Sequence, residues 1–350
     1  MTELAYVYGK PSATGDLRTV PEDFQVIELL PFTASGEGEH LLIRVRKTGA
    51  NTIYVAKQLA RYFKVKPHFV TYAGLKDRNA VTEQYFGVHV PGKAEYDLSD
   101  FDCPGVEILS YKRHNKKLKT GALLGNRFTL TLRNVSDVEQ VQARWQQIVE
   151  GGVANYFGEQ RFGIDGNNLE GAKQLFAGRR INDRNRRGFY LSAARSHIFN
   201  QMLAKRINMG AFDTPMNGDV FMLSGSRSVF AEATIDETII RRLQEQDINI
   251  TLPLWGKGEL MTQADAADFE AQAASEHSEF CRGLEKFGLK QERRACRLTM
   301  TAPALTVNDD TVVVSFILPA GCFATTVLRE LINYNDISAQ ERDHEHTDQQ

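Results

Sequence analysis

The sequence contains few cysteines and no long hydrophobic run. Its 350 residues include four cysteines, and no two of them form a Cys-x-x-Cys pair, so neither a zinc site nor a disulfide framework is indicated. No stretch approaches the roughly 18 consecutive apolar residues of a membrane-spanning helix. The N-terminus, residues 1–4, lacks the cationic start and apolar core of a signal peptide. We therefore expect a cytoplasmic protein with neither a membrane partner nor a metal ion.

The motifs of several common enzyme classes are also absent. The sequence has no Gly-x-x-x-x-Gly-Lys-Ser/Thr loop for nucleotide phosphates and no Gly-x-Gly-x-x-Gly turn for a dinucleotide. It has no Gly-x-Ser-x-Gly nucleophile elbow. His344 and His346 flank Glu345, but such pairs in a polar C-terminal segment are usually solvated rather than metal-bound. The classes of protein that remain are an enzyme without a cofactor and a binding protein.

Charge of one sign is not in excess, since the formal net charge is −2. This balance argues weakly against non-specific binding of nucleic acid, although the placement of charge matters more than its sum. Two segments are strongly basic, residues 112–119 and residues 179–187. The candidate phosphate contacts are Lys112, Arg113, Lys116 and Lys117 in the first and Arg184, Arg186 and Arg187 in the second. Each segment is either a solvated face or a set of contacts to RNA phosphates.

The segment that carries most information is 74–84, Gly-Leu-Lys-Asp-Arg-Asn-Ala-Val-Thr-Glu-Gln. The residues before it, 68–73, are aromatic and β-branched, and those after it alternate in hydrophobicity, so strands are predicted on both sides. Asp77 therefore lies at a strand end, between Lys76 and Arg78, which favour its ionised form. Such a carboxylate can act as a base, a nucleophile or a metal ligand. The alternative is that it only forms a turn.

Five segments together resemble the tRNA pseudouridine synthase D (TruD) family. The resemblance extends from about Tyr8 to Asn333, and it is specific because all five segments occur in the same order and spacing. The segments are Pro21-Glu22-Asp23-Phe24, Ala73-Gly74-Leu75-Lys76-Asp77 with Thr82 and Gln84, Gly125-Asn126-Arg127-Phe128, residues 155–163 and residues 318–325.

The resemblance implies a cofactor-free isomerase that converts uridine thirteen of certain tRNAs to pseudouridine. Asp77 matches the family's catalytic aspartate, with an auxiliary role for Lys76. Phe24, Asn126 and Phe323 match positions around the uridine, and Phe128 is a candidate wall of the pocket. Without the resemblance, the phenylalanines would be assigned to the core and Asn126 to a turn. The residue that accepts the carbon-bound proton stays open, as does attack at the sugar or the base.

A different class of function is a non-catalytic structured-RNA binding protein or tRNA chaperone on the same fold. Binding alone does not require Asp77, so the presence of this aspartate together with Lys76, Thr82 and Gln84 favours the enzyme. The partner is tRNA under either hypothesis. The oligomeric state is not determined by the sequence, and a monomer is the expectation.

The predicted fold is α+β, with a mixed, mainly antiparallel sheet in a pseudouridine synthase-like domain and an inserted, largely helical second domain. The order of predicted elements suggests the insertion, and the resemblance implies the same division. The expected boundaries are 1–151 plus 299–336 for the catalytic domain, 152–298 for the inserted TRUD domain and 337–350 for a disordered tail. Residues 155–163 are a possible hinge, and Arg293, Arg294 and Arg297 are candidates to line an RNA channel.

Helices and strands are predicted from hydrophobic periodicity and capping residues. Asn51 and Thr52 should cap one helix, and Ser136 with Glu139 has the spacing of a capping box for another. The predicted strands are 24–29, 40–46, 68–73, 128–133, 297–300 and 311–318. The predicted helices are 53–63, 137–150, 168–175, 192–208, 264–287 and 326–332.

Overall fold

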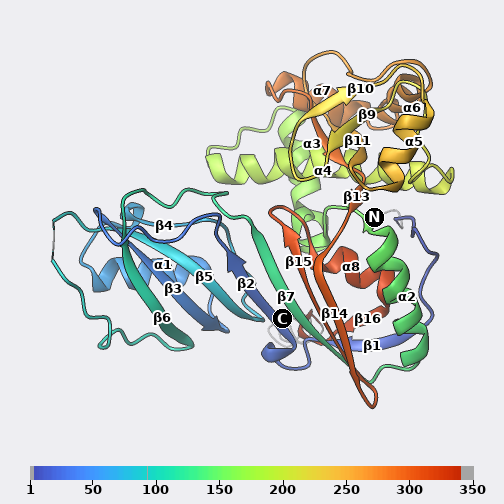
Figure 1. Ribbon diagram of the computed structural model, residues 1–350. Helices are drawn as coiled ribbons and strands as arrows, with labels where there is room; N and C mark the ends of the chain where they lie inside the picture. Colours follow the sequence, from blue (N-terminus) through green and yellow to red (C-terminus); the bar gives the residue numbers. More distant parts are fainter. Residues whose placement is uncertain (1–3, 93, 340–350) are drawn as a thin grey trace, which may run out of the picture. The chain divides into compact units, whose positions relative to one another are not determined.

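The computed structural model describes residues 4–92 and 94–339 (Figure 1). The chain divides into two compact units. The first unit comprises Met1–Lys10, Glu150–Thr299 and Thr325–Glu330, and the second comprises Pro11–Val149, Met300–Ala324 and Leu331–Gln350. The expected insertion, 152–298, lies inside the longest segment of the first unit. Of the expected disordered tail, 340–350 lie outside the described residues, and Ile337–Ala339 form a helical turn.

The second unit is built on a ten-stranded mixed sheet. The main order is β14-β15-β7-β2-β5-β3-β6, with β4 on β5 and with β1 on β7 and β16. The strands are β1 (Thr14–Leu17), β2 (Phe24–Leu29), β3 (His40–Thr48), β4 (Val70–Tyr72), β5 (Val81–His89), β6 (Val106–His114), β7 (Gly125–Arg133), β14 (Thr301–Asn308), β15 (Thr311–Pro319) and β16 (Asn333–Asp336). Most pairs are antiparallel, while β2–β5 and β1–β16 are parallel. The predicted mixed, mainly antiparallel sheet is therefore confirmed.

One face of this sheet is covered by two helices at separate places. Alternate residues of a strand share a face, and the register aligns Lys47, Thr82, Val26, Phe128 and Phe316 in one row across five strands. Helix α1 (Thr52–Tyr62) packs on the β3–β5 end of this face through a cluster of buried apolar side chains. Helix α2 (Val138–Gly151) packs on the other end, where the ring of Trp145 lies 6.1 Å from that of Phe316.

The N-terminal cap of α1 is the predicted one, whereas that of α2 differs from the prediction. Asn51 Oδ1 accepts a hydrogen bond from Tyr54 N at 2.7 Å and caps α1, as predicted. The predicted capping box at Ser136 and Glu139 was wrong. Asp137 caps α2 by accepting from Gln140 N at 2.9 Å, because Ser136 Oγ instead accepts from Thr14 N of β1 at 2.8 Å.

The first unit combines helices with a four-stranded sheet of order β10-β9-β11-β12. Its helices are α3 (Asn167–Phe176), α4 (Arg184–Asn208), α5 (Glu237–Gln244), α6 (Ala264–Ser275) and α7 (Ser278–Lys286), with most of α8 (Ala324–Leu331). Its strands are β9 (Val220–Leu223), β10 (Val229–Ala231), β11 (Ile248–Leu254) and β12 (Glu292–Ala295), and β8 (Val153–Ala154) pairs separately with β13 (Arg297–Leu298).

Two predictions for this region require correction. The single helix predicted over 264–287 is two helices, since α6 ends at Ser275 and α7 begins at Ser278. Helix α5 was not predicted, and neither were the strands β9–β12. These strands are three to seven residues long, and runs this short carry little periodic signal against a helical background.

Candidate active site

Asp77 lies in the loop between β4 and β5 and forms an ion pair with Arg18. Arg18 Nη2 donates to Asp77 Oδ2 at 3.0 Å, and the side chains are 7% and 35% exposed, respectively. The carboxylate therefore remains accessible while its cationic partner is buried. The sequence had suggested Lys76 and Arg78 as the cations beside Asp77. Instead, Lys76 Nζ donates to Glu28 Oε1 at 2.9 Å and Arg78 Nε donates to the carbonyl of Gly49.

Arg18 has several interactions that fix its orientation. Its backbone has φ of 58°, in the left-handed region that few non-glycine residues adopt. Its Nη1 donates to Asp336 Oδ2 at 2.5 Å, and its guanidinium lies 4.0 Å from the centre of the Phe24 ring. Arg18 thus contacts two candidate site residues. It forms an ion pair with the candidate catalytic carboxylate of Asp77 and a cation–π contact with Phe24, a candidate substrate-binding residue.

The segment Pro21–Phe24 supports this arrangement locally. Pro21 opens a 3-10 turn that ends at Asp23. The buried Asp23 carboxylate accepts from Val20 N at 3.1 Å and from Arg133 Nη2 of β7 at 2.7 Å. These bonds fix the start of β2 against β7, so the motif places Phe24 at a defined position on the sheet.

The loop that carries Asp77 is held by polar side chains beneath it. Thr52 Oγ1, at the start of α1, accepts from Lys76 N and donates to Gln84 Oε1, each at 3.0 Å. Gln84 Nε2 in turn donates to the carbonyl of Gly74. Because Thr52 and Gln84 are both buried, the loop is attached to α1 and β5 through hydrogen bonds that water cannot easily replace.

Lys47 holds the backbone of Asp77 itself. This residue is 1% exposed, and its Nζ donates to the carbonyl oxygens of Ala50 and Asp77, both at 2.8 Å. The pKa of Lys47 is lowered from 10.5 to about 8, mainly by burial; the charge of Asp77 opposes this shift and that of Lys76 contributes to it. A buried amine therefore fixes the position at which the Asp77 carboxylate is presented.

The sheet places Phe24, Asn126 and Phe128 on one face. Glu28 is paired with Asn126, and Val26 with Phe128. The rings of Phe24 and Phe128 meet edge to face with centroids 6.3 Å apart, and both side chains are buried. Their burial is also what a core role predicts. Asn126 differs from them, because its Oδ1 is buried without a hydrogen-bond partner, which is unusual unless a ligand supplies one.

The residue before Asn126 must be glycine. A Cβ on Gly125 would lie 2.2 Å from the carbonyl oxygen of Leu318 on the paired strand β15. The chain then leaves β15 beside the start of β7, with Ala320 N donating to the carbonyl of Leu124 at 3.3 Å. Phe323 follows this turn and is half-buried. The register therefore explains why two motifs far apart in sequence lie at the same end of the sheet.

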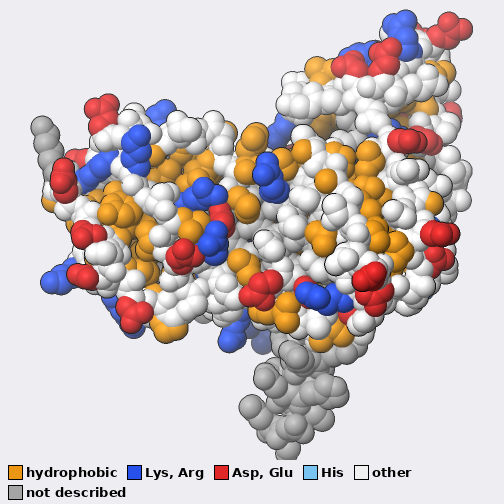
Figure 2. Space-filling model, turned by 60° about the horizontal axis from the view of Figure 1, so that its bottom comes forward, with side chains coloured by type: hydrophobic (Ala, Val, Ile, Leu, Met, Phe, Trp, Pro, Cys, Tyr) orange, Lys and Arg blue, Asp and Glu red, His pale blue; other side chains and the backbone are white. Residues whose placement is uncertain are grey.

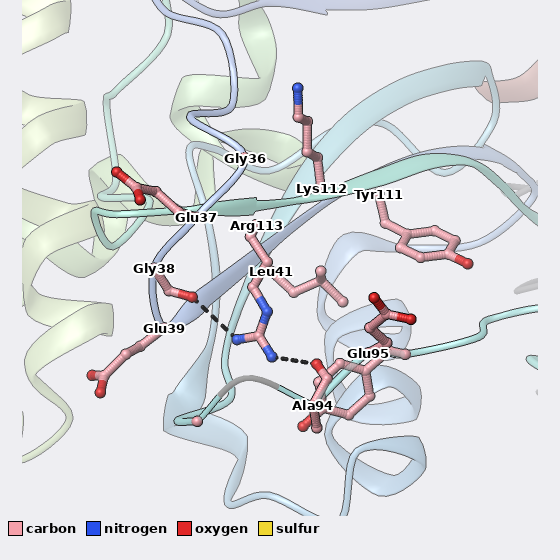
Figure 3. Close-up of a pocket in the computed structure, with 12 residues that line it drawn as sticks. Gly36, Glu37, Gly38, Glu39, Leu41, Ala94, Glu95, Tyr111, Lys112 and Arg113 are labelled. Atoms are coloured by element: carbon pink, nitrogen blue, oxygen red, sulfur yellow. Dashed lines mark hydrogen bonds between the residues drawn. The ribbon is translucent and has the colours of Figure 1, made fainter.

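The basic segment 112–119 is only partly available to a ligand. Lys112, Lys116 and Lys117 are exposed. Arg113 is the exception among the phosphate contacts that we predicted, because its guanidinium donates to the carbonyls of Ala94 at 2.6 Å and Gly38 at 3.1 Å (Figure 3). It also donates to the carbonyl of Val90 at 2.8 Å. Its donors are thus used within the protein.

Arg113 lies in a cavity of about 780 Å³ near the edge strand β6. The lining includes the carboxylates Glu37, Glu39 and Glu95 (Figure 3). Three acidic side chains disfavour the phosphates of RNA. The cavity is also at the opposite end of β3 from Lys47, about 20 Å away at 3.4 Å per residue. It is therefore separate from the Asp77 site.

The second basic segment lies at the start of α4 in the first unit. Arg184 and Arg186 are exposed and Arg187 is half-buried. Asp183 caps the helix by accepting from Asn185 N at 2.8 Å and Arg186 N at 3.1 Å. Acidic and basic side chains are interspersed on the face shown in Figure 2, so that face as a whole offers no extended surface of one charge sign for phosphates.

The other arginines expected near RNA are engaged inside the first unit. Arg293 forms an ion pair with Glu270 at 2.8 Å, and both side chains are buried. Arg294 lies 4.1 Å from the ring centre of Phe157 and donates to Asn155 Oδ1. Arg161, in the proposed hinge, donates to Ser192 Oγ at 3.0 Å, and burial lowers its pKa. Arg297, the third arginine predicted to line the channel, is half-buried, and its guanidinium lies 5.5 Å from the ring centre of Phe212. Arg293 and Arg294 therefore make interior contacts instead of the predicted contacts to RNA.

Neither a metal site nor a membrane span is found within residues 4–92 and 94–339. No group of three or more His, Cys, Asp or Glu residues there could hold a metal ion. None of the helices described is long and apolar enough to cross a membrane.

Comparison with known proteins gives consistent matches over nearly the whole chain. A family described as tRNA pseudouridine synthase D (TruD) matches residues 2–179 and 176–331. A protein named tRNA pseudouridine synthase D from Colwellia psychrerythraea is 55% identical, over 97% of this chain and 95% of its own length. A protein of the same name from Shewanella oneidensis is 50% identical, over 96% and 91%.

A solved structure from Methanosarcina mazei carries the same family name. It superimposes with a TM-score of 0.71 over 95% of this chain and 96% of its own. Its sequence identity is only 23%, so this likeness concerns the fold. The fold is retained although most side chains differ.

Proposed function

Because the chain belongs to the tRNA pseudouridine synthase D (TruD) family, we propose that it isomerises uridine thirteen of its substrate tRNAs, with Asp77 as the catalytic carboxylate. The observation that supports this assignment is the ion pair between Asp77 and the buried Arg18, whose guanidinium also covers Phe24. One side chain thereby links a candidate nucleophile to a candidate residue for holding the base.

The reaction breaks the bond between N1 of uracil and C1′ of ribose, turns the base and joins C5 to C1′. The proton on C5 then leaves and N1, now detached from the sugar, takes up a proton, so substrate and product are isomers and no oxidant, reductant or co-substrate is consumed. The Asp77 carboxylate attacks either C1′ of the sugar or C6 of the base. Both routes require an ionised carboxylate at a fixed position, which Arg18 and Lys47 provide through the side chain and the backbone, respectively.

The detached base must be held while it turns. The uridine first leaves its stack, which costs a few kcal/mol that contacts in the pocket offset. Asn126 Oδ1 has no partner in the protein, and as an acceptor it suits the N3–H of uracil. Phe323 and Phe24 would hold the faces of the base, with Phe128 as a wall. Lys76 has an indirect role, since its ion pair with Glu28 lies beside Asn126 in the register.

Phosphate contacts would position the RNA without reading its sequence. In the second unit we assign them to Lys112, Lys116 and Lys117, and in the first unit to Arg184, Arg186 and Arg187, all of which retain some exposure. In this proposal residues 1–151 with 299–336 are the catalytic domain and 152–298 the inserted TRUD domain. A tRNA substrate fits a cytoplasmic location.

The test maps pseudouridine in tRNA from cells with and without the gene, and measures turnover of the purified protein on unmodified tRNA. Asp77→Asn keeps the side-chain shape and removes the charge, so it should abolish turnover while tRNA affinity changes by less than about 1 kcal/mol. Asp102→Asn, at an exposed aspartate of the same unit, is the matched control. Near-normal turnover by Asp77→Asn would exclude the assignment, and tRNA binding without turnover by the wild type would favour a chaperone.

A further inference from the structure

Phe189 on α4 is more exposed than any other phenylalanine, tyrosine or tryptophan of residues 4–92 and 94–339. Its exposed fraction is 52%, against 40% for Tyr111, the next in order. Its neighbour Tyr190 faces the interior, since a Cβ added at Gly171 of α3 would lie 2.4 Å from the Tyr190 ring. Successive helical residues point about 100° apart, so the docking of Tyr190 directs Phe189 to solvent.

The surface around Phe189 is basic. Residues 179–187 contain five arginines and one aspartate. Arg186 is three positions before Phe189 on the helix and is therefore its neighbour on the surface. No carboxylate of the described residues forms an ion pair with Arg184, Arg186 or Arg187. The nearby Asp183 instead accepts from two backbone N–H groups, so it forms no ion pair with these arginines, and five arginines against one aspartate leave the segment with a net positive charge.

We propose that Phe189 stacks on an unpaired base of the RNA while Arg184 and Arg186 hold the phosphates beside that base. An aromatic ring in a basic surface is the usual arrangement for binding single-stranded nucleic acid, because every base has a π-face while its backbone carries charge. Bases inside an A-form duplex are not accessible to such a ring. The inference rests on the proposed function and adds to it that α4 contacts a loop, bulge or end of the tRNA. A protein partner would match the ring less well, because the surrounding charge is predominantly positive.

The test compares the affinity of the full-length protein for an unmodified tRNA transcript at several salt concentrations. Phe189→Ala and Phe189→Leu should each weaken binding by about 5- to 150-fold, whereas Phe189→Tyr should bind like the wild type. The slope of log affinity against log salt should not change, because these variants keep every cation. Met209→Ala is the matched control, since Met209 is a 63% exposed apolar side chain at the other end of α4.

Three outcomes would overturn the inference. Wild-type affinity of both Phe189→Ala and Phe189→Leu would show that the ring contacts no RNA. Weak binding by Phe189→Ala together with normal binding by Phe189→Leu would show that bulk, rather than the ring, is needed. A crosslinkable benzoyl-phenylalanine at position 189 that labels only another protein in a cell extract would assign the surface to a protein partner.

The outcome is distinguishable from failure of the proposed function. Loss of affinity in Phe189→Ala with no pseudouridine formed by the wild type would leave the inference standing and exclude the isomerase assignment for this tRNA. Pseudouridine formation by the wild type, together with unchanged tRNA affinity of Phe189→Ala and Phe189→Leu, would support the isomerase assignment and exclude the stacking role of Phe189. A wild-type protein that binds no tRNA would overturn both.

Discussion

Arg18 and Asp77 are 59 positions apart in sequence and form an ion pair with an N–O distance of 3.0 Å. The other terminal nitrogen of Arg18 donates to Asp336, at the end of the last strand of the sheet. Two carboxylates thus share one guanidinium, and Asp336 fixes the plane in which Arg18 approaches Asp77. Because Arg18 is 7% exposed, water cannot readily substitute for either carboxylate.

Removal of the Arg18 charge should slow turnover without weakening tRNA binding. A hydrogen bond to a charged group contributes about 1.5–3 kcal/mol, so Arg18→Gln should lower kcat roughly 10- to 150-fold. Asp336→Ala should have a smaller effect of the same kind, because it acts through Arg18. In a double-mutant cycle, Asp336→Ala should add nothing to Arg18→Gln. Fully additive effects would contradict this link and leave Asp336 with a role only in anchoring β16.

Asn126→Ala should impair turnover while leaving stability nearly unchanged. The Asn126 Oδ1 has no protein partner, so its removal leaves no protein group unpaired, whereas uracil would lose a hydrogen bond. Phe24 is different, since it is 4% exposed and truncation to alanine should cost about 3–5 kcal/mol of stability. Phe24→Leu is therefore the better probe of the ring. A large drop in melting temperature for Asn126→Ala with unchanged turnover would assign Asn126 to the core.

Lys47→Met should destabilise the protein and slow the reaction. It leaves the carbonyls of Ala50 and Asp77 unpaired, at about 1–3 kcal/mol each. Lys57→Met, at an exposed position of α1, is the control. A lower kcat at unchanged tRNA affinity would indicate that the Lys47 amine positions the Asp77 backbone for the reaction. A normal kcat in a stably folded Lys47→Met variant would exclude this positioning role.

The contribution of Lys47 to stability should also depend on pH. In the unfolded chain the amine holds its proton up to about pH 10.5, and in the folded protein it releases the proton near its lowered pKa of about 8. Between these values the unfolded state binds more protons, so rising pH favours the folded state. The free energy of unfolding of the wild type, relative to Lys47→Met, should therefore increase from pH 8 to 10.5, by at most about 1.4 kcal/mol per unit. Denaturant titrations over this range measure it, and a constant difference would contradict the shift.

Neutralising the exposed cations should change tRNA binding in a salt-dependent way. Glutamine at Lys112, Lys116 and Lys117, or at Arg184, Arg186 and Arg187, should flatten the slope of log affinity against log salt by about 0.7–0.9 for each phosphate that is no longer bound. Saturated turnover should stay close to normal. Arg113→Gln should instead destabilise the protein, because three backbone carbonyls lose their donor. Unchanged slopes for both clusters would identify them as solvated faces.

The loop of Asp77 could be predicted because its information is local. Strand-forming residues flank it on both sides, and the motif residue Gln84 lies on the next strand, where it holds Gly74. The role of Arg18 could not be predicted, because its ion pair with Asp77 connects the end of β1 to the β4–β5 loop, which is far away in sequence. Its left-handed backbone conformation could not be predicted either, because neither adjacent residue is a glycine. The only signal is its place just before Pro21–Phe24, the turn that directs the chain into β2.

Basic segments in the sequence predicted RNA-contacting residues less well than sequence motifs predicted the Asp77 loop. A run of cations in the sequence does not show which side chains are turned inward. Arg113 and Arg293 are both strongly basic and both engaged inside the protein, because a guanidinium can satisfy several carbonyls or a buried carboxylate at once. Arg184 and Arg186 remain exposed because they lie in the first turn of α4, which begins eight residues before the predicted start at residue 192, whereas the buried residues of this helix begin only at Ala193.

The parallel pairing of β1 with β16 has a consequence for synthesis on the ribosome. Thr14–Leu17 lies against Asn333–Asp336, so the strand that precedes Arg18 has no parallel neighbour until almost the entire polypeptide has emerged. A nascent chain that already contains the Asp77 loop therefore exposes an unpaired edge while the long intervening segment is being translated, and such edges invite pairing with other chains. Termination after Phe323 but before Asn333 would yield a product with every candidate base-holding residue and a guanidinium that lacks one of its two carboxylates.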